Sequence, residues 1–150
     1  MKGKLLVAMQ FLLLASLALS ESSNSASRLE ISIAIILALL AVLILFKSFK
    51  DLGSALTPLP ESKEGAELVT SGIYSYLRHP IYSALFLLTL AAYLWKQSGG
   101  VLITAFLLTA LLLYKARYED QILREKFPES IEFQKSIPAF FPRFRKGKKP

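Results

Sequence analysis

The sequence predicts an all-α integral membrane protein with four transmembrane helices, a helical hairpin and a cytoplasmic C-terminal amphipathic helix. Hydrophobic residues make up 53% of the 150-residue chain and the mean hydropathy is +0.46, both high for a soluble domain of this size. The apolar residues also fall into blocks separated by short polar stretches, which is the pattern that membrane spans produce. The whole chain, 1–150, is expected to form a single membrane domain.

Four apolar blocks are the candidate spans, because a helix needs about 20 apolar residues to cross a bilayer. They cover about 5–20, 29–48, 81–96 and 100–116. The first block is short and follows two lysines, so it also resembles a cleaved signal peptide, which would leave three spans. Both interpretations stay open. The last two blocks are joined by KQSGG, a polar turn with two glycines that predicts a helical hairpin.

The distribution of basic residues predicts the orientation. Lys and Arg are concentrated at the start of the chain, around the loop 49–80 and in the region 117–150, whereas the opposite connections hold only Arg28 and Lys96. Because basic loops stay on the cytoplasmic side, both termini, this loop and the C-terminal region are expected to be cytoplasmic. The net charge of +7 is assigned to these segments, so nucleic acid is not an expected partner.

The two cytoplasmic regions have different predicted structures. Pro58 and Pro60 argue against a helix early in the loop, and ELVTSGIY predicts an extended piece that ends in a turn at Gly72. After the fourth block, helical spacing without a breaker before Pro128 predicts that the helix continues as an amphipathic one. The aromatic and basic segment 131–144 is expected to lie on the membrane surface.

Arg78, His79 and Pro80 stand directly before the third block. Pro80 suits the first turn of a helix, which would place His79 at the N-cap, where free N–H groups attract anions. Arg78 adds a fork-shaped donor suited to a carboxylate. The alternative is that Arg78 is a membrane anchor and that the neighbouring tyrosines form an interfacial aromatic belt. The residues alone leave both interpretations open.

An acidic pair, Glu119 and Asp120, follows the fourth block. Because a hairpin brings its two cytoplasmic ends together, Glu119 and His79 are expected to face one cleft. A carboxylate there accepts hydrogen bonds from an ammonium group or from ribose hydroxyls, and the alternative is a solvated pair that balances nearby basic residues. The chain has no cysteine and one histidine, so neither a thiolate nucleophile nor a metal site is expected.

The order of these motifs resembles the isoprenylcysteine carboxyl methyltransferase family and the related phospholipid N-methyltransferases, over about residues 56–142. In that family a G-x-Y-x-x-x-R-H-P-x-Y stretch opens a membrane hairpin, and E-E-x-x-L with an F-G or F-P step follows it. The first motif is matched by Gly72, Tyr74, Arg78, His79, Pro80 and Tyr82. The second is matched by Glu119 and Leu123, with Asp120 in place of the second glutamate, and Phe127-Pro128 provides the step.

The resemblance implies a membrane methyltransferase that uses S-adenosyl-L-methionine on a lipophilic acceptor entering from the bilayer, for which a prenylcysteine-like carboxylate is one candidate. No G-x-G-x-x-G pattern occurs, so the cofactor would not be held as in soluble nucleotide-binding folds. The implied catalytic residues are Arg78, which would engage a carboxylate, and Glu119, which would bond polar groups of the cofactor. The implied cofactor-binding residues are Gly72, Tyr74, His79, Pro80, Tyr82, Glu119 and Asp120.

Two other function classes remain open. One is a membrane reductase of the steroid-reductase type, which shares this helical layout and would bind NADPH. The other is a non-catalytic membrane scaffold whose partners are lipids. The sequence does not choose among a carboxylate, an amine and a thiol as the methyl acceptor, and it does not predict an oligomeric state.

Overall fold

A computed structural model describes residues 2–23, 25–53, 57 and 68–142 of the chain. Over this part the chain forms five α-helices and one 3₁₀ turn, without a strand, which confirms the all-α prediction there. The elements are α1 (Lys2–Leu19), α2 (Arg28–Leu52), η2 (Gly72–Ser75), α3 (Pro80–Lys96), α4 (Gly99–Lys126) and α5 (Ser130–Ser136). Pro58, Pro60 and the last eight residues of the basic tail, for which predictions were made, lie outside the described residues.

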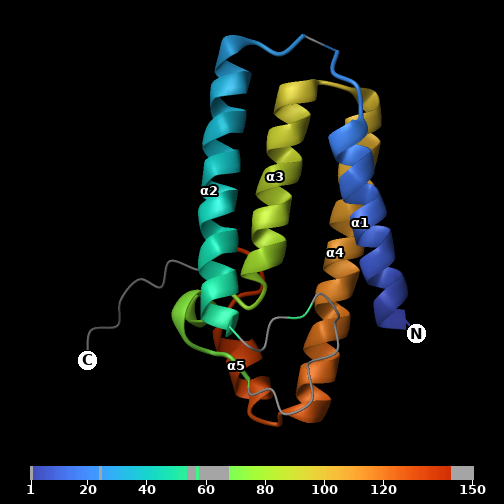
Figure 1. The fold of residues 1–150 in the computed structure, drawn as a ribbon. Helices are drawn as coiled ribbons and strands as arrows, with labels where there is room; N and C mark the ends of the chain where they lie inside the picture. The colour runs from blue at the N-terminus through green and yellow to red at the C-terminus, as the bar shows by residue number, and fades with distance from the viewer. Residues whose placement is uncertain (1, 24, 54–56, 58–67, 143–150) are drawn as a thin grey trace.

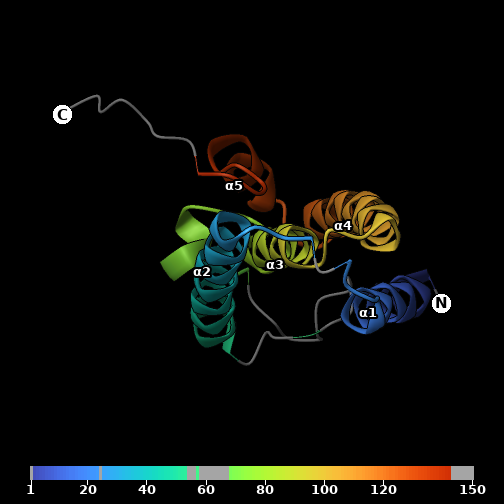
Figure 2. The ribbon, with the colours of Figure 1, turned by 90° about the horizontal axis from the view of Figure 1, so that it is seen from above.

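The four long helices run up and down beside one another (Figure 1). α2 packs on α3, α3 on α4, and α4 on α1, so the helices follow the order α2, α3, α4, α1 when the bundle is seen from above (Figure 2). α1 begins, α2 ends, α3 begins and α4 ends at the same end of the bundle, where η2 and α5 also lie (Figure 1). Every residue of the predicted site belongs to a segment at this end.

Three of the described helices are long and apolar enough to cross a membrane, namely α1, α2 and α4. α3 is equally apolar but has 17 residues, fewer than the roughly 20 that a full span needs. α4 has 28 residues because it continues past the predicted fourth span to Lys126. Three clear spans and one shorter apolar helix therefore occupy the four predicted positions, and the count of four spans and the orientation stay predictions.

Small residues form the contact between α2 and α3. Ala34, Ala41 and Ser48 recur at every seventh position of α2 and are at most 2% exposed. Ala84 and Ala91 have the same spacing on α3 and are also buried. Small side chains let two helix backbones approach closely, which is how helices pack where lipid removes the hydrophobic force between them. α3 is thereby held along its length, despite being short.

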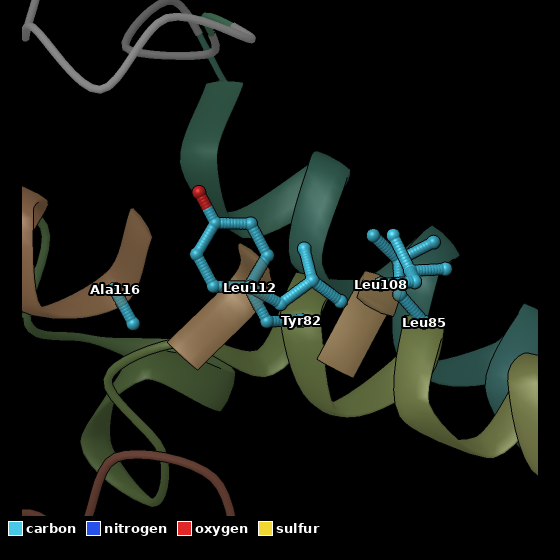
Figure 3. Close-up of a cluster of buried hydrophobic side chains, with 5 residues drawn as sticks. All are labelled: Tyr82, Leu85, Leu108, Leu112 and Ala116. Atoms are coloured by element: carbon cyan, nitrogen blue, oxygen red, sulfur yellow. The ribbon is translucent and has the colours of Figure 1, made fainter. Parts of the chain in front are cut away.

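An apolar cluster fixes α3 against α4. It consists of Tyr82 and Leu85 from α3 and Leu108, Leu112 and Ala116 from α4, all buried. Figure 3 shows the Tyr82 ring beside Leu112, with its hydroxyl pointing away from Leu85 and Leu108. The cluster therefore holds the Tyr82 ring in place and leaves its hydroxyl outside the cluster.

The turn between α3 and α4 differs from the predicted glycine turn. Gly99 and Gly100 are the first residues of α4, and the left-handed residue is Gln97, with φ 50°. A left-handed conformation costs a non-glycine residue about 1–2 kcal/mol. Gln97 has compensating contacts, because its backbone N–H donates to Tyr93 O at 2.8 Å and its amide donates to Glu30 Oε1 at 2.9 Å. Tertiary contacts thus stabilise a conformation that glycine was expected to supply.

Lys96 caps the C-terminus of α1. Its ammonium group donates to the carbonyl oxygens of Leu17 at 3.0 Å, Ala18 at 2.7 Å and Ser20 at 2.7 Å. The last carbonyls of a helix lack partners within the helix, and they carry the negative end of its dipole. We expect Lys96→Met to lower the free energy of unfolding by about 1–3 kcal/mol, because hydrogen bonds to a charged donor are lost.

Thermal unfolding of the detergent-solubilised protein measures this change. The matched control is Lys135→Met, which removes an exposed ion pair with Glu132 and is expected to change the unfolding temperature much less. Equal shifts in the two variants would show that the cap of α1 contributes no more than a surface pair.

Candidate functional site

The N-terminus of α3 carries the arginine–histidine–proline motif. Pro80 is the first residue of α3 and His79 is its N-cap, as the sequence predicts. The His79 ring is 7% exposed and stacks on the Tyr82 ring, with 5.5 Å between ring centroids. The motif therefore forms a rigid corner at which His79 and Tyr82 face α4.

A network of charged groups joins this corner to the acidic pair of α4. His79 Nε2 lies 3.0 Å from Asp120 Oδ1, and His79 Nδ1 lies 3.4 Å from Glu119 Oε2. The Arg78 guanidinium forms an ion pair with Asp120, and the Tyr82 hydroxyl donates to Glu119. These five residues, Arg78, His79, Tyr82, Glu119 and Asp120, are called the charge network below. The structure thus brings together most of the residues predicted for the site.

The charge network favours the charged form of His79. Burial of the ring favours the neutral form, but hydrogen bonds and charges from Asp120 and Glu119 outweigh it and raise the pKa of His79 above its usual 6.5. Imidazolium donates from both ring nitrogens, which matches the two carboxylates on its two sides.

A raised pKa of His79 predicts a stability that depends on pH. The contribution of His79 is fully present below pH 6.5 and is lost as the pH rises through the raised pKa of the folded state. Each unit by which folding raises the pKa corresponds to about 1.4 kcal/mol of stability at low pH. We therefore expect the unfolding temperature to fall as the pH rises across this window, and to stay constant there in His79→Gln. Because the chain has one histidine, no other imidazole titrates in the window. An unchanged slope in His79→Gln would contradict the assignment.

The 3₁₀ turn η2 lies beside the charge network. Gly72, its first residue, has φ +60°, and the Asp51 carboxylate of α2 accepts a hydrogen bond from Ile73 N at 2.7 Å. Tyr74 is 7% exposed, and its hydroxyl has no hydrogen-bond partner among the described residues. Burial, together with the charges of Glu119 and Asp51, raises the pKa of Tyr74. Its hydroxyl therefore stays protonated and is a donor that lacks an acceptor in the part of the chain that the structure describes.

A C-terminal segment, 137–140, called the strap below, closes one side of the site. Arg78 N donates to Pro138 O at 3.0 Å and His79 N to Ala139 O at 2.9 Å, and Arg78 Nε donates to Ile137 O at 3.0 Å. The Phe140 ring lies 5.8 Å from the His79 ring. The sequence placed this segment on the membrane surface and missed its role, because backbone carbonyl groups make these polar contacts and leave no side-chain motif.

The burial of Lys115 was also not predicted from the sequence. Lys115 lies at the end of the predicted fourth span, 100–116, beside the basic region that follows, yet it is 2% exposed inside the bundle. Its ammonium group lies 2.8 Å from Gln10 Oε1 of α1 and 5.3 Å from the centroid of the Tyr82 ring. A lysine at the end of an apolar block has the sequence signature of a membrane boundary, so the pattern gave no sign of burial.

An apolar groove of about 280 Å³ runs between α3 and α4. One of its lining residues, Phe86, contacts the strap residue Phe140 at 5.3 Å between ring centroids, and Phe140 in turn contacts His79. The groove is therefore linked to the charge network through two aromatic rings. Its lining residues are Phe86, Thr89, Leu90, Tyr93, Leu102, Ala105, Phe106 and Thr109.

A family model described as phospholipid methyltransferase matches residues 29–130, which is more than half of the chain. The chain belongs to this family. Both motifs of the charge network, before α3 and in α4, lie within the matched range. Membership of the phospholipid methyltransferase family, with three helices long and apolar enough to span a membrane, indicates a membrane protein of this family. The broader resemblance is thus confirmed, whereas the assignment to isoprenylcysteine carboxyl methyltransferases stays a prediction.

Two curated proteins are similar to this phospholipid methyltransferase family member. The cobalt-zinc-cadmium resistance protein CzcN of Cupriavidus metallidurans is 44% identical over 79 residues, which are 51% of this chain and 36% of that protein. The nickel-cobalt-cadmium resistance protein NccN of Alcaligenes xylosoxydans xylosoxydans is 38% identical over 84 residues, 54% of this chain and 38% of that protein. The matches thus span little more than a third of either relative. Within the described part of this chain, no group of three or more His, Asp or Glu side chains is arranged to hold a metal ion.

Proposed function

We propose that this chain is an S-adenosylmethionine-dependent methyltransferase whose acceptor is lipophilic and reaches the site from the bilayer. The observation that carries the proposal is the charge network, which unites the arginine–histidine–proline motif and the acidic pair. Two aromatic contacts link this network to an apolar groove. Family membership supports the cofactor, because phospholipid methyltransferases typically use S-adenosylmethionine.

The donors and acceptors of the site fit this cofactor. S-adenosylmethionine carries an ammonium group, a carboxylate and ribose hydroxyls, so its site needs both acceptors and donors. Glu119 and Asp120 supply carboxylate oxygens, and Arg78 supplies guanidinium N–H groups. The buried Tyr74 hydroxyl adds a donor that lacks a partner within the described chain, and such a group is costly unless something bonds to it.

Further predicted contacts would shape the site around the cofactor. Gly72 leaves η2 without a side chain at its first residue, and Pro80 fixes the start of α3. The stacked rings of His79 and Tyr82 would form one wall.

When bound, S-adenosylmethionine supplies an electrophilic methyl group on a positively charged sulfur. The residues of the chain therefore have to orient the partners and exclude water rather than to transfer protons in several steps. The charge network suits this task, because its ion pairs fix the side chains of His79, Arg78 and Asp120 before any ligand arrives. The strap and the buried ring of Tyr82 exclude water from one side.

The acceptor would lie with its hydrocarbon chain in the groove between α3 and α4 and its polar head beside the charge network. The groove is apolar, and the contacts from Phe86 through Phe140 to His79 connect it with the network. A prenylcysteine-like carboxylate and a phospholipid amine both combine a hydrocarbon chain with a polar head. Arg78 would serve a carboxylate head, by the charge-assisted hydrogen bonds that guanidinium forms.

Calorimetric titration of the purified protein with S-adenosylhomocysteine tests the cofactor. We expect saturable binding, and no binding of NADPH at the same concentrations. Binding of NADPH alone would favour a membrane reductase, and binding of neither ligand would favour a non-catalytic scaffold; either result would reject the proposal.

Transfer of a labelled methyl group tests the acceptor. We expect label in a farnesylated cysteine derivative or in phosphatidylethanolamine vesicles, and none in the corresponding head group without its hydrocarbon chain. Ala105→Phe, which fills the groove, should lower transfer without changing S-adenosylhomocysteine affinity. Ala110→Phe, at an exposed position of the same helix outside the groove, is the matched control. Equal transfer by both variants would show that the groove does not hold the acceptor.

A further inference from the structure

Lys115 is the largest of the fully buried side chains in the described part of the chain. It lies in α4, within a helix apolar enough to cross a membrane, and faces the interior of the bundle. A charged group inside a membrane bundle is expensive, and it usually marks a functional site whose partners hold it in place. The motifs that carry the methyltransferase resemblance do not include it, so its role needs a separate explanation.

The contacts of Lys115 lead directly to the charge network. Its ammonium group lies 5.3 Å from the centroid of the Tyr82 ring, within the range of a cation–π interaction. The hydroxyl of the same tyrosine donates to Glu119. Lys115 and Glu119 are also four residues apart on α4, so they lie on the same face of the helix. The buried ammonium group is therefore linked to Glu119 through the ring of Tyr82.

A second contact of Lys115 comes from α1. Gln10 Oε1 lies 2.8 Å from Lys115 Nζ, a hydrogen bond between residues that are 105 positions apart. An ammonium group has three N–H donors and needs such acceptors when it is removed from water. α1 lies before the range that matches the family, which starts at residue 29. Gln10 thus connects a helix outside the family match to the site.

We propose that Lys115 is a positioning residue for the methyltransferase site, and that Gln10 of α1 holds it against Tyr82. In this arrangement the ammonium group fixes the Tyr82 ring, and Tyr82 in turn directs the Glu119 carboxylate toward the cofactor. α1 therefore contributes a contact that orders the site, in addition to anchoring the chain in the membrane. The inference rests on the proposed function where it concerns the cofactor, but the positioning of Tyr82 can be measured without any ligand.

Tyrosine labelled with ¹³C at Cζ gives that measurement by NMR of the detergent-solubilised protein. The chain has six tyrosines, and the Tyr82 signal is assigned from its loss in Tyr82→Phe. We expect Lys115→Met and Gln10→Met each to move the Tyr82 signal, because the hydroxyl loses its fixed hydrogen bond to Glu119. Methionine is as long as glutamine and one atom shorter than lysine, and it removes the polar end of either side chain. Each variant leaves a buried polar partner without its contact, so unfolding temperatures are measured to establish that both proteins are folded.

The matched control is Ser16→Ala. Ser16 Oγ contacts Thr104 Oγ1 at 3.4 Å, which is a second polar contact between α1 and α4 that does not reach the charge network. Ser16→Ala should leave the Tyr82 signal where it is. An unmoved Tyr82 signal in Lys115→Met, or an equal movement in Ser16→Ala, would overturn the proposal regardless of whether the protein binds a cofactor.

Calorimetry then separates positioning from simple structural support. We expect Lys115→Met to weaken S-adenosylhomocysteine binding by about tenfold, as misplacing a remote supporting group commonly does. In a Tyr82→Phe background the same substitution should weaken binding by less than about threefold, because two residues that act through one contact are not additive. Its effect on the unfolding temperature should be the same in both backgrounds.

The binding outcomes distinguish this inference from the proposed function. If the wild-type protein binds no S-adenosylhomocysteine, the proposed function fails, while the NMR result still decides whether Lys115 positions Tyr82. If the wild type binds and Lys115→Met binds equally well, the proposed function stands and the positioning role is rejected. Full additivity with Tyr82→Phe would likewise reject it, because Lys115 would then act independently of Tyr82.

Discussion

Replacing Glu119 with glutamine is expected to weaken S-adenosylhomocysteine binding by about 10- to 100-fold, because a hydrogen bond to a charged group contributes about 1.5–3 kcal/mol. Glutamine keeps the size of the side chain and can still accept from the Tyr82 hydroxyl. It has no charge to offer an ammonium group, however, and it weakens the contact with His79, where the carboxylate now lies 3.4 Å from Nδ1. Calorimetric titration measures the change.

Glu125→Gln is the control for this substitution. Glu125 lies further along α4 and is exposed, where it accepts a hydrogen bond from Gln121 on the same helix. Glu125→Gln changes the net charge by the same amount as Glu119→Gln but should leave S-adenosylhomocysteine binding unaltered. Unfolding temperatures of both variants establish that the proteins are folded. If the two variants bind alike, Glu119 does not contact the cofactor.

Gly72→Ala is expected to displace η2 and to abolish most of the binding at the site. A Cβ atom at Gly72 would lie 2.1 Å from Asp51 Oδ2, so the Asp51 carboxylate would have to leave its hydrogen bond with Ile73 N. The backbone φ of +60° adds a strain of about 1–3 kcal/mol for a residue with a side chain. Tyr74, two residues further on, would move with the turn. Loss of S-adenosylhomocysteine binding and a lower unfolding temperature would report these effects.

Two comparisons separate the clash from the strain. Gly99→Ala introduces the same methyl group at the start of α4, where a Cβ atom meets nothing within 4 Å, and should be tolerated. In an Asp51→Ala background the carboxylate is absent, so Gly72→Ala should cost less than in the wild type. An equal cost in both backgrounds would mean that the conformation of the backbone, and not Asp51, requires glycine.

Local pattern accounts for most of the helices and for the motif residues. Apolar blocks predicted α1, α2 and α4, because apolar segments of about this length can lie in lipid, although the first block was short enough to resemble a signal peptide as well. Pro80 predicted the start of α3, because its missing N–H is harmless only in a first turn. The hairpin then predicted that His79 and Glu119 would meet, which the structure shows at 3.4 Å.

The sequence failed where distant contacts override local preference. Gln97 takes the left-handed conformation in place of the neighbouring glycines because Glu30, far along the chain, bonds its side chain. Lys115 is buried where Gln10 of α1 and the Tyr82 ring of α3 contact its ammonium group. None of these partners is near in sequence, so no periodicity or spacing points to them.

The strap has a further consequence for how this site tolerates change. Residues 137–139 bond to Arg78 and His79 through carbonyl oxygens, which every amino acid possesses, and Pro138 loses nothing there by lacking an N–H. Substitutions in this stretch therefore leave the polar contacts available, whereas an insertion or a deletion would shift every carbonyl out of register. Residues 137–139 therefore require a fixed number of positions after α5 rather than particular side chains, and composition matters in the strap at Phe140, whose ring contacts His79 and Phe86.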